Sequence, residues 1–282
     1  MSVPPLRSDA ELLTMPIALR SGLFEGKTVL ISGGGSGIGK AAAIWFARLG
    51  ARVAICGRTL ERLQVVEGLL RGLRAEARGY AMTIRDPEAV AALIANVWRD
   101  FGALDILVNN AGGQFPQAAI EFSAKGFQAV IETNLHGPWY MMQQAARHWR
   151  DAGQPGIIVN VVAVVERGMP GVAHTCAARA GVIHLAKTVA VEWAPLNIRV
   201  NCVAPGIIAT EGMRAYPPEA VAAMPRSNPM MRFGQVEDTA NAICYLASEA
   251  SGFMTGTVLT VDGGFRLWGS QWTIPEPAYF MD

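Results

Sequence analysis

The sequence lacks an excess of charge of either sign and lacks a long hydrophobic run. Its 24 Lys and Arg residues nearly balance 23 Asp and Glu, leaving a net charge of +1 over 282 residues. No basic surface for a phosphate backbone or an anionic lipid is therefore expected. The most apolar stretch, residues 156–165, contains Asn160 and is far shorter than the roughly 20 residues that a bilayer demands. We expect neither a nucleic-acid nor a membrane partner.

Cysteine is scarce and histidine is scattered. The four cysteines form no CxxC pair, which argues against a disulfide framework and against a zinc site. His136, His148 and His184 lack ligand spacing with carboxylates, so no metal is expected. Residues 1–20 lack the apolar run of a signal peptide, and the final Tyr-Phe-Met-Asp is not a peroxisomal address. The expected location is the cytoplasm.

What the sequence does contain is a regular alternation of short apolar runs and helical patterns. The predicted strands are residues 27–32, 52–56, 79–83, 104–108, 157–162, 200–203 and 258–261, and the predicted helices are 40–49, 60–73, 89–98, 127–149 and 177–192. Nearly all-apolar strands separated by helices indicate a parallel sheet covered on both faces. We predict one α/β domain with a Rossmann-type, doubly wound, seven-stranded parallel sheet in three layers. Residues 1–22 form an N-terminal extension and residues 265–282 a C-terminal tail.

One segment interrupts this alternation. Residues 207–233 hold four prolines and four methionines and read as a long irregular insertion. Such insertions in compact domains are usually functional. We predict a substrate lid whose flexible methionines offer an adaptable apolar surface, although methionines can also be ordinary core fillers.

A glycine-rich turn follows the first predicted strand. It reads Ser32-Gly33-Gly34-Gly35-Ser36-Gly37-Ile38-Gly39 and leads directly into a helix. Glycine allows a pyrophosphate to approach the backbone closely, and the helix N-terminus offers free N–H groups and a positive dipole end. A dinucleotide site is predicted here, and the alternative is a merely structural turn.

The GxxxGxG spacing occurs together with Asn109-Asn110-Ala111-Gly112 and Pro205-Gly206, in this order and on the matching elements. Over residues 22–264 the chain resembles the short-chain dehydrogenase/reductase family. The resemblance implies that the cofactor lies against three parts of the chain: the glycine turn, the ends of the third and fourth strands, and the start of the lid. The residues so implied are Gly33, Ser36, Gly37, Ile38, Gly39, Thr83, Ile84, Asn110, Gly112, Ile208 and Thr210. Asn109 is expected to join neighbouring strands.

The choice of cofactor depends on the end of the second strand. A site for NAD usually places a carboxylate there, whereas a 2′-phosphate needs a cation. This chain has Cys56-Gly57-Arg58, with no acid and with a guanidinium that can bind phosphate in a bidentate manner. NADP(H) is therefore predicted. The alternative is that Arg58 is only a solvated residue at a helix start.

The catalytic positions depart from the family pattern. Most members carry a Ser, and a Tyr four residues before a Lys. Here Thr175 stands at the Tyr position and Arg179 at the Lys position, while Asn134 matches the active-site Asn. The pKa of a threonine hydroxyl is too high for ready proton donation, and arginine cannot pass on a proton at neutral pH. Arg179 is expected instead to hold the cofactor ribose or to stabilise an oxyanion.

Reduction of an enoyl thioester suits these residues, because the enolate that forms needs fixed donors rather than a strong acid. With Gly112-Gly113-Gln114-Phe115 and Ala177-Ala178-Arg179-Ala180-Gly181, the chain looks like the peroxisomal trans-2-enoyl-CoA reductase and 2,4-dienoyl-CoA reductase branch, which implies a role in fatty acid metabolism. The dienoyl reductases keep a displaced Tyr that residues 162–165 lack, so the closer likeness is to the trans-2-enoyl reductases. Two alternatives stay open: a dehydrogenase of acyclic branched terpenoid alcohols or aldehydes, and a catalytically silent nucleotide-binding protein. His174 and Cys176 are further candidate weak acids. The resemblance also implies a homotetramer or dimer.

Overall fold

The computed structural model describes residues 6–268, and within them the sheet has seven strands, all parallel. The strands are β1 (Thr28–Ser32), β2 (Arg52–Gly57), β3 (Ala77–Ala81), β4 (Ile106–Asn109), β5 (Gly156–Val161), β6 (Ile198–Pro205) and β7 (Val258–Val261). Their order is β3-β2-β1-β4-β5-β6-β7. The predicted Rossmann-type fold is confirmed. The chain reverses its winding direction between β1 and β4, where such sheets bind ligands.

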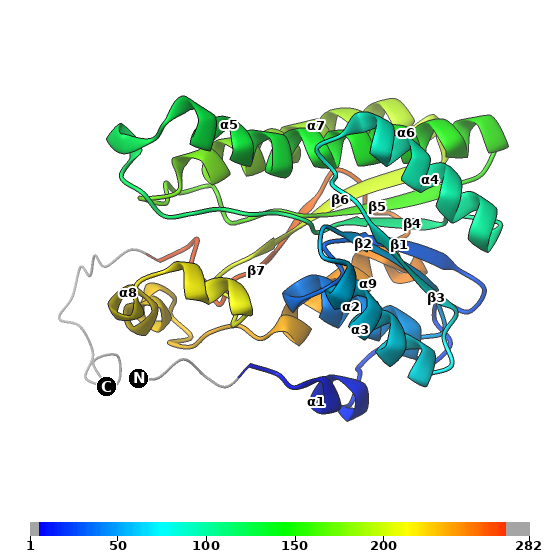
Figure 1. The fold of residues 1–282 in the computed structure, drawn as a ribbon, viewed down its shortest axis with the longest axis horizontal. Coiled ribbons are helices and arrows are strands. Elements are labelled where there is room, and N and C mark those ends of the chain that lie inside the picture. Colours follow the sequence, from blue (N-terminus) through cyan, green and yellow to red (C-terminus); the bar gives the residue numbers. More distant parts are fainter. Residues whose placement is uncertain (1–5, 269–282) are drawn as a thin grey trace.

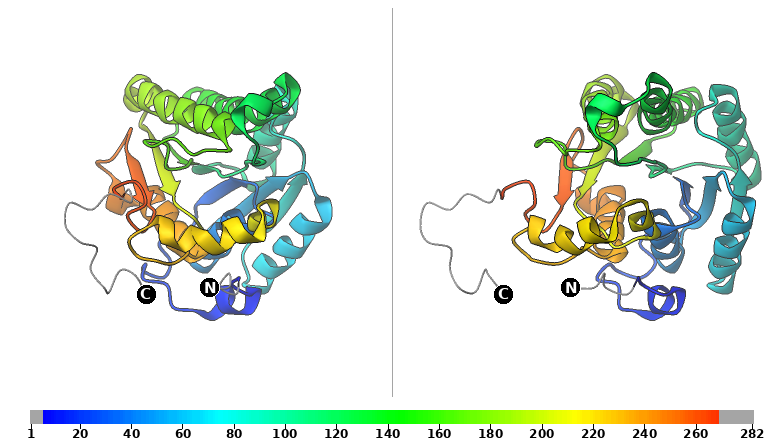
Figure 2. Two further views of the ribbon diagram at one scale, coloured as in Figure 1. Left: turned by 90° about the vertical axis from the view of Figure 1, so that its left-hand side faces the viewer. Right: turned by 60° about the vertical axis from the view of Figure 1, so that its left-hand side comes forward.

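Helices cover both faces of the sheet (Figures 1 and 2). The helices are α1 (Asp9–Thr14), α2 (Gly37–Arg48), α3 (Leu60–Gly72), α4 (Pro87–Phe101), α5 (Ala124–Ile131), α6 (Gly137–Ala152), α7 (Ala173–Trp193), α8 (Pro218–Ala223) and α9 (Val236–Ala247). Those that pack on one face are α2, α3 and α9, and those that pack on the other are α4, α6 and α7.

The strand residues alternate between these two layers. Val29 and Ile31 of β1 lie in the core beneath α2 and α9, whereas Leu30 lies in the core beneath α4 and α6. All five residues of β1 are buried, because a parallel strand with helices on both sides has no solvent-facing side. This double burial explains why the strand sequences are nearly continuous apolar runs.

Three helical parts differ from the prediction. The expected helix 127–149 is divided into α5 and α6 by a π-turn, Glu132–His136. Helix α9 was not predicted, although Val236, Ala240 and Ile243 repeat at helical spacing. The expected irregular segment 207–233 contains α8 and short 3₁₀ turns, so much of it is regular.

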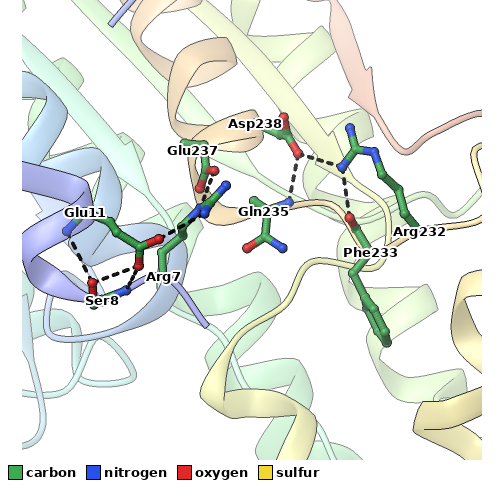
Figure 3. A network of polar contacts seen from close by, with 8 residues as sticks. All are labelled: Arg7, Ser8, Glu11, Arg232, Phe233, Gln235, Glu237 and Asp238. Atoms are coloured by element: carbon green, nitrogen blue, oxygen red, sulfur yellow. Dashed lines mark hydrogen bonds and ion pairs between the residues drawn. The ribbon is translucent and has the colours of Figure 1, made fainter. Parts of the chain in front are cut away.

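The N-terminal extension also has structure that was not predicted. A capping box between Ser8 and Glu11 starts α1, and Leu12 on this helix is only 1% exposed. We call residues 6–15 the N-terminal arm. Arg7 donates from Nε to Oε1 of Glu237 in α9 at 2.7 Å, so the arm bridges to an element near the other end of the chain (Figure 3). The arm is therefore part of the packed domain.

Two further expectations concern the chain ends and membranes. The predicted tail, residues 265–282, is described only as far as Trp268, and the rest lies outside the described residues, as do residues 1–5. No helix within residues 6–268 combines the length and apolar character needed to cross a bilayer.

Candidate functional site

The glycine turn joins β1 to α2 at the carboxyl edge of the sheet. Gly33 has φ +68°, and a Cβ built on Gly39 would lie 2.3 Å from the carbonyl oxygen of Gly33. Neither position can hold a larger residue. Ser36 is the N-cap of α2 but makes no side-chain cap bond, so the first-turn N–H groups of α2 stay open to an anion. The predicted turn residues, including Gly37 and Ile38, thus lie at a helix start that suits a pyrophosphate.

Asn110 fixes this turn against the end of β4. Its Nδ2 donates to the carbonyl oxygens of Ser32 at 3.1 Å and Gly33 at 3.2 Å. The Ser32 hydroxyl accepts from the backbone N–H groups of Asn110 and Ala111, both at 3.1 Å. Asn110 therefore positions the turn, and its amide donor is occupied. Asn109 donates to Oδ1 of Asn160 at 2.9 Å and joins β4 to β5 as expected.

Arg58 lies directly after β2 and is exposed. Within residues 6–268 its guanidinium makes no ion pair and no hydrogen bond. A second cation, missed in the sequence, lies one helical turn further on: a Cβ built on Gly35 would lie 3.2 Å from Cβ of Arg62. The signal for it was the four-residue spacing between the two arginines. Arg58 thus lies at the end of β2, and Arg62 lies against the glycine turn.

Thr83 and Ile84 follow β3 on the same edge. Ile84 is buried, and a Cβ built on Gly137 would lie 2.5 Å from its Cδ1, so this side chain packs beneath the start of α6. Thr83 is half-buried, and its hydroxyl accepts from the backbone N–H of Arg85 at 3.4 Å. Thr83 is thus the more open of the two residues.

The π-turn carries Asn134 toward the loop after β4. The Nδ2 of Asn134 donates to the carbonyl oxygen of Gly113 at 2.9 Å, and its Oδ1 accepts from the N–H of Gly113 at 3.0 Å. A Cβ built on the neighbouring Gly112 would lie 2.2 Å from Nη2 of Arg179. The structure therefore brings Asn134, Gly112 and Arg179 together. Both Nδ2 and Oδ1 of Asn134 are bonded to the backbone of Gly113, so Asn134 is a positioning residue.

Helix α7 presents Thr175 and Arg179 one turn apart. Thr175 is 3% exposed and Arg179 7%. Among the described residues, neither Oγ1 of Thr175 nor Nη1 of Arg179 has a hydrogen-bond partner. Burial lowers the pKa of Arg179 to about 10, with the Cys202 thiol acting in the opposite direction, so the group is cationic at neutral pH. A buried cation without a partner is costly, and such groups usually have a ligand.

His174 points into an aromatic cluster formed with Phe115, Phe122 and Phe127. Its ring centroid lies 4.7 Å from that of Phe115 and 4.5 Å from that of Phe122. Nδ1 accepts from the N–H of Thr175 at 2.8 Å, and burial lowers the pKa of His174, so the imidazole is neutral at pH 7. His174 thus packs the loop after β4 onto α7. Cys176 is half-buried beside it.

The segment predicted to be a lid, residues 207–233, reaches both sides of this arrangement. Near its start, Cγ2 of Thr210 lies 3.4 Å from the position of a Cβ on Gly37. Ile208 is buried and forms a parallel bridge with Gly234. Further on, Tyr216 accepts a hydrogen bond from Nε2 of Gln114 in the loop after β4. The lid therefore connects the glycine turn with the loop that faces Arg179.

A cavity outside the site and the distribution of possible metal ligands also bear on the assignment. A cavity of about 600 Å³ lies at the amino ends of the strands, where Lys27, Asp105 and Phe253 line it. Its lining contains none of the predicted site residues, so it is separate from the candidate site. No group of three His, Cys, Asp or Glu side chains within residues 6–268 could hold a metal ion.

Comparison with known proteins identifies the family. The family model described as enoyl-(acyl carrier protein) reductase matches residues 33–266. The chain is a short-chain dehydrogenase/reductase. It is an oxidoreductase by family, and such proteins bind a nicotinamide dinucleotide, which fits the glycine turn and the open start of α2.

Two curated relatives and one solved structure show what this dehydrogenase/reductase is similar to. It is 38% identical over 259 residues to a probable 2,4-dienoyl-CoA reductase of Bacillus subtilis, covering 90% of this chain and 100% of the relative. It is 36% identical to the peroxisomal 2,4-dienoyl-CoA reductase of Pongo abelii, covering 86% and 84%. The structure of a citronellol catabolism dehydrogenase of Pseudomonas aeruginosa superposes with a TM-score of 0.79 at 36% identity, covering 88% and 98%. The resemblance to the trans-2-enoyl-CoA and 2,4-dienoyl-CoA reductase branch is confirmed, and both curated relatives named here are 2,4-dienoyl-CoA reductases rather than the trans-2-enoyl reductases that the sequence favoured.

Proposed function

We propose that this protein uses NADP(H) to reduce the double bond of an enoyl thioester. The observation that carries the proposal is the buried Arg179, whose Nη1 has no partner among the described residues and lies on the same helix as the unpartnered Thr175 hydroxyl. These two groups can donate hydrogen bonds to an oxygen on which negative charge develops. The dienoyl-CoA reductase names of two relatives support the same substrate class.

Different residues would bind different parts of the cofactor. The glycine turn and the start of α2 would hold the pyrophosphate, and Arg58, with Arg62 beside it, would bind the 2′-phosphate. Thr83 would lie against the adenine, and Ile208 and Thr210 would hold the nicotinamide amide. Arg179 would contact the nicotinamide ribose and the thioester oxygen.

When bound, the reduced nicotinamide supplies a hydride. Hydride addition at the β-carbon would move the electrons of the double bond into a new bond between the α-carbon and the carbonyl carbon, while the carbonyl π electrons would move onto the thioester oxygen. A proton would then add to the α-carbon as the carbonyl re-forms, and the oxidised nicotinamide would be released. Arg179 and Thr175 stabilise the enolate oxygen, because the former stays protonated and the latter can donate one hydrogen bond. Neither delivers the proton at neutral pH, so water or a weak acid such as Cys176 would supply it.

The test is steady-state oxidation of NADPH with a panel of trans-2-enoyl-CoA, 2,4-dienoyl-CoA and aldehyde substrates. Turnover of the thioesters supports the proposal. Turnover of aldehydes alone contradicts it, and tight NADPH binding with no turnover of any substrate favours a silent nucleotide-binding protein.

A second candidate is a dehydrogenase of acyclic branched alcohols or aldehydes. It is favoured by the likeness to the citronellol catabolism dehydrogenase and by the apolar cluster of the lid, which includes Phe233, Met213 and Met224. An apolar chain of either class would fit that surface. The absence of the family Tyr at position 175 counts against carbonyl chemistry.

The remaining proposals rest on the resemblance. We propose that the protein is cytoplasmic and forms a homotetramer. Each subunit is one domain, in which residues 207–233 form a lid over the substrate. Val191 on α7 is 77% exposed, which fits a helix face that packs against another copy. Size-exclusion chromatography with light scattering measures the assembly, and a monomer at micromolar concentration contradicts it.

A further inference from the structure

Arg85 connects two parts of the site that are distant in sequence. It follows Thr83 and Ile84 in the loop after β3, but its guanidinium reaches the end of α5. Nε donates to Oγ1 of Thr133 at 2.6 Å, and Nη2 donates to the carbonyl oxygen of Ala129 at 2.7 Å. Thr133 Oγ1 in turn donates to the same carbonyl at 2.9 Å. The three residues therefore form a closed hydrogen-bonded cluster.

This cluster lies where α5 changes into the π-turn. The N–H of Gly137 donates to the carbonyl oxygen of Glu132, five residues back, which widens the helix at this point. A π-turn is a less stable conformation than an α-helix and needs external contacts to persist. A cationic donor at the carbonyl end of α5 supplies such contacts. The ion pair of Arg85 with Glu132 at 3.9 Å is half-exposed and contributes little beside these hydrogen bonds.

The π-turn sets the direction of Asn134, the residue after Thr133. Asn134 holds Gly113 by two hydrogen bonds of 2.9 and 3.0 Å, and the adjacent Gly112 packs against Nη2 of Arg179. A continuous series of contacts thus runs from the loop after β3, through Arg85 and the π-turn, to Arg179. Without the π-turn, Asn134 would rotate by about 100° around the helix and lose Gly113.

We propose that Arg85, in the loop on the adenine side of the cofactor pocket, is a positioning residue that fixes the geometry of Asn134, Gly113 and Arg179 by holding the π-turn. It contacts neither Gly113 nor Arg179 itself, so its effect on the reaction passes through the π-turn. The roles given to the adenine side of the pocket and to Arg179 rest on the proposed function. The contacts that join them through Arg85 and the π-turn do not depend on it.

The first test needs no ligand. In the full-length protein, hydrogen exchange at the Gly113 amide is measured for wild type, Arg85→Met and Thr133→Val. Loss of the cluster is expected to speed exchange at Gly113 about ten- to a hundredfold, because charged hydrogen bonds of this kind are removed. Arg85→Lys, which keeps one cationic donor, should restore part of the protection. The matched control is Arg78→Met, which removes an exposed arginine paired with Asp100 at 2.9 Å on β3.

The second test uses the holoenzyme well below its melting temperature. Arg85→Met is expected to lower kcat about tenfold while the affinity for adenosine 2′,5′-bisphosphate changes less than twofold. Unchanged Gly113 exchange, or a fall in melting temperature with unchanged kcat, overturns the proposal. A large loss of affinity for the bisphosphate also overturns it, because Arg85 would then bind the cofactor directly. If wild type binds no NADPH and turns over no substrate, the proposed function fails, and Gly113 exchange alone decides the role of Arg85.

Discussion

At the scale of single residues, Arg58 offers a direct test of cofactor choice, because it is exposed at the end of β2 without a partner among the described residues. We expect Arg58→Ala to weaken NADPH binding about ten- to a hundredfold, the effect of losing a charged hydrogen bond to phosphate. NADH binding should change little. Fluorescence titration of both cofactors measures this, with Arg99→Ala as a control for an exposed arginine outside the site. Equal affinities of wild type for the two cofactors would contradict the NADP(H) assignment.

Arg179 and Thr175 are expected to contribute unequally to turnover. Arg179→Ala should abolish most NADPH oxidation with a trans-2-enoyl-CoA, and Arg179→Lys should retain some, because the charge survives although the planar fork does not. Thr175→Val removes one hydrogen-bond donor and should cost about 2.7–4 kcal/mol at most. Steady-state kinetics on the three variants gives these values. Full activity in Arg179→Ala would show that the reaction does not need the cation at position 179.

The pH profile provides an independent reading of the same residue. Burial lowers the pKa of Arg179 to about 10, so its charge is complete at neutral pH and is lost as the pH rises through that value. A lysine begins from a pKa of about 10.4 and suffers the same burial, so Arg179→Lys should lose activity at a lower pH than wild type. Activity measured from pH 7 to 11 tests this order. Identical alkaline limbs would show that the group at position 179 does not titrate in the reaction.

At the scale of elements, a side-chain hydrogen bond from Gln114 to Tyr216 joins the loop after β4 to the lid. Tyr216→Phe removes the acceptor and keeps the ring. Because a neutral hydrogen bond contributes about 1 kcal/mol, we expect KM for the acyl substrate to rise about fivefold, with kcat nearly unchanged. Tyr245→Phe in α9, which removes a hydroxyl 3.5 Å from the Met254 sulfur, is the control. An equal effect of both variants on KM would argue against closure by the lid.

The elements also show what the sequence can and cannot predict. The strands and the glycine turn depend on local patterns, so they were predicted with only small errors at their ends. The π-turn was missed because its hydrogen-bond partners, the backbone of Gly113 and the side chain of Arg85, come from other loops. The arm helix α1 did carry a local signal, the Ser8 and Glu11 capping box.

In the site, too, features with a local sequence pattern were predicted and features that depend on contacts between loops were not. Arg179 and Thr175 were found because they replace residues of a motif with fixed spacing. The side-chain amides of Asn134 and Asn110 are bonded to backbone carbonyl groups. These contacts could not be predicted, because they form only when the loops are folded. Arg62 and Arg85 belong to no motif, and their roles depend on distances between elements.

At the scale of the whole molecule, the N-terminal arm stabilises the domain from outside the matched family region, which begins at residue 33. Leu12 is 1% exposed and belongs to the core cluster with α2 and α9. We expect Leu12→Ala to cost about 2–5 kcal/mol of unfolding free energy, the range for buried leucines. Thermal unfolding measures this, and Leu60→Ala, at a residue 45% exposed, is the control. Equal melting temperatures for the two variants would show that the arm does not contribute to stability.

The same arm contacts both α2 and α9, and these two elements become available at different times during synthesis. Arg48 donates to the carbonyl oxygen of Leu12, and these residues leave the ribosome almost together. Arg7 and Glu237 are 230 residues apart, so their ion pair has to wait about 10 to 50 seconds of translation. The arm can therefore dock on α2 early in synthesis, whereas its contact with α9 forms only after most of the sheet has been made. That contact is a marker for a nearly complete sheet.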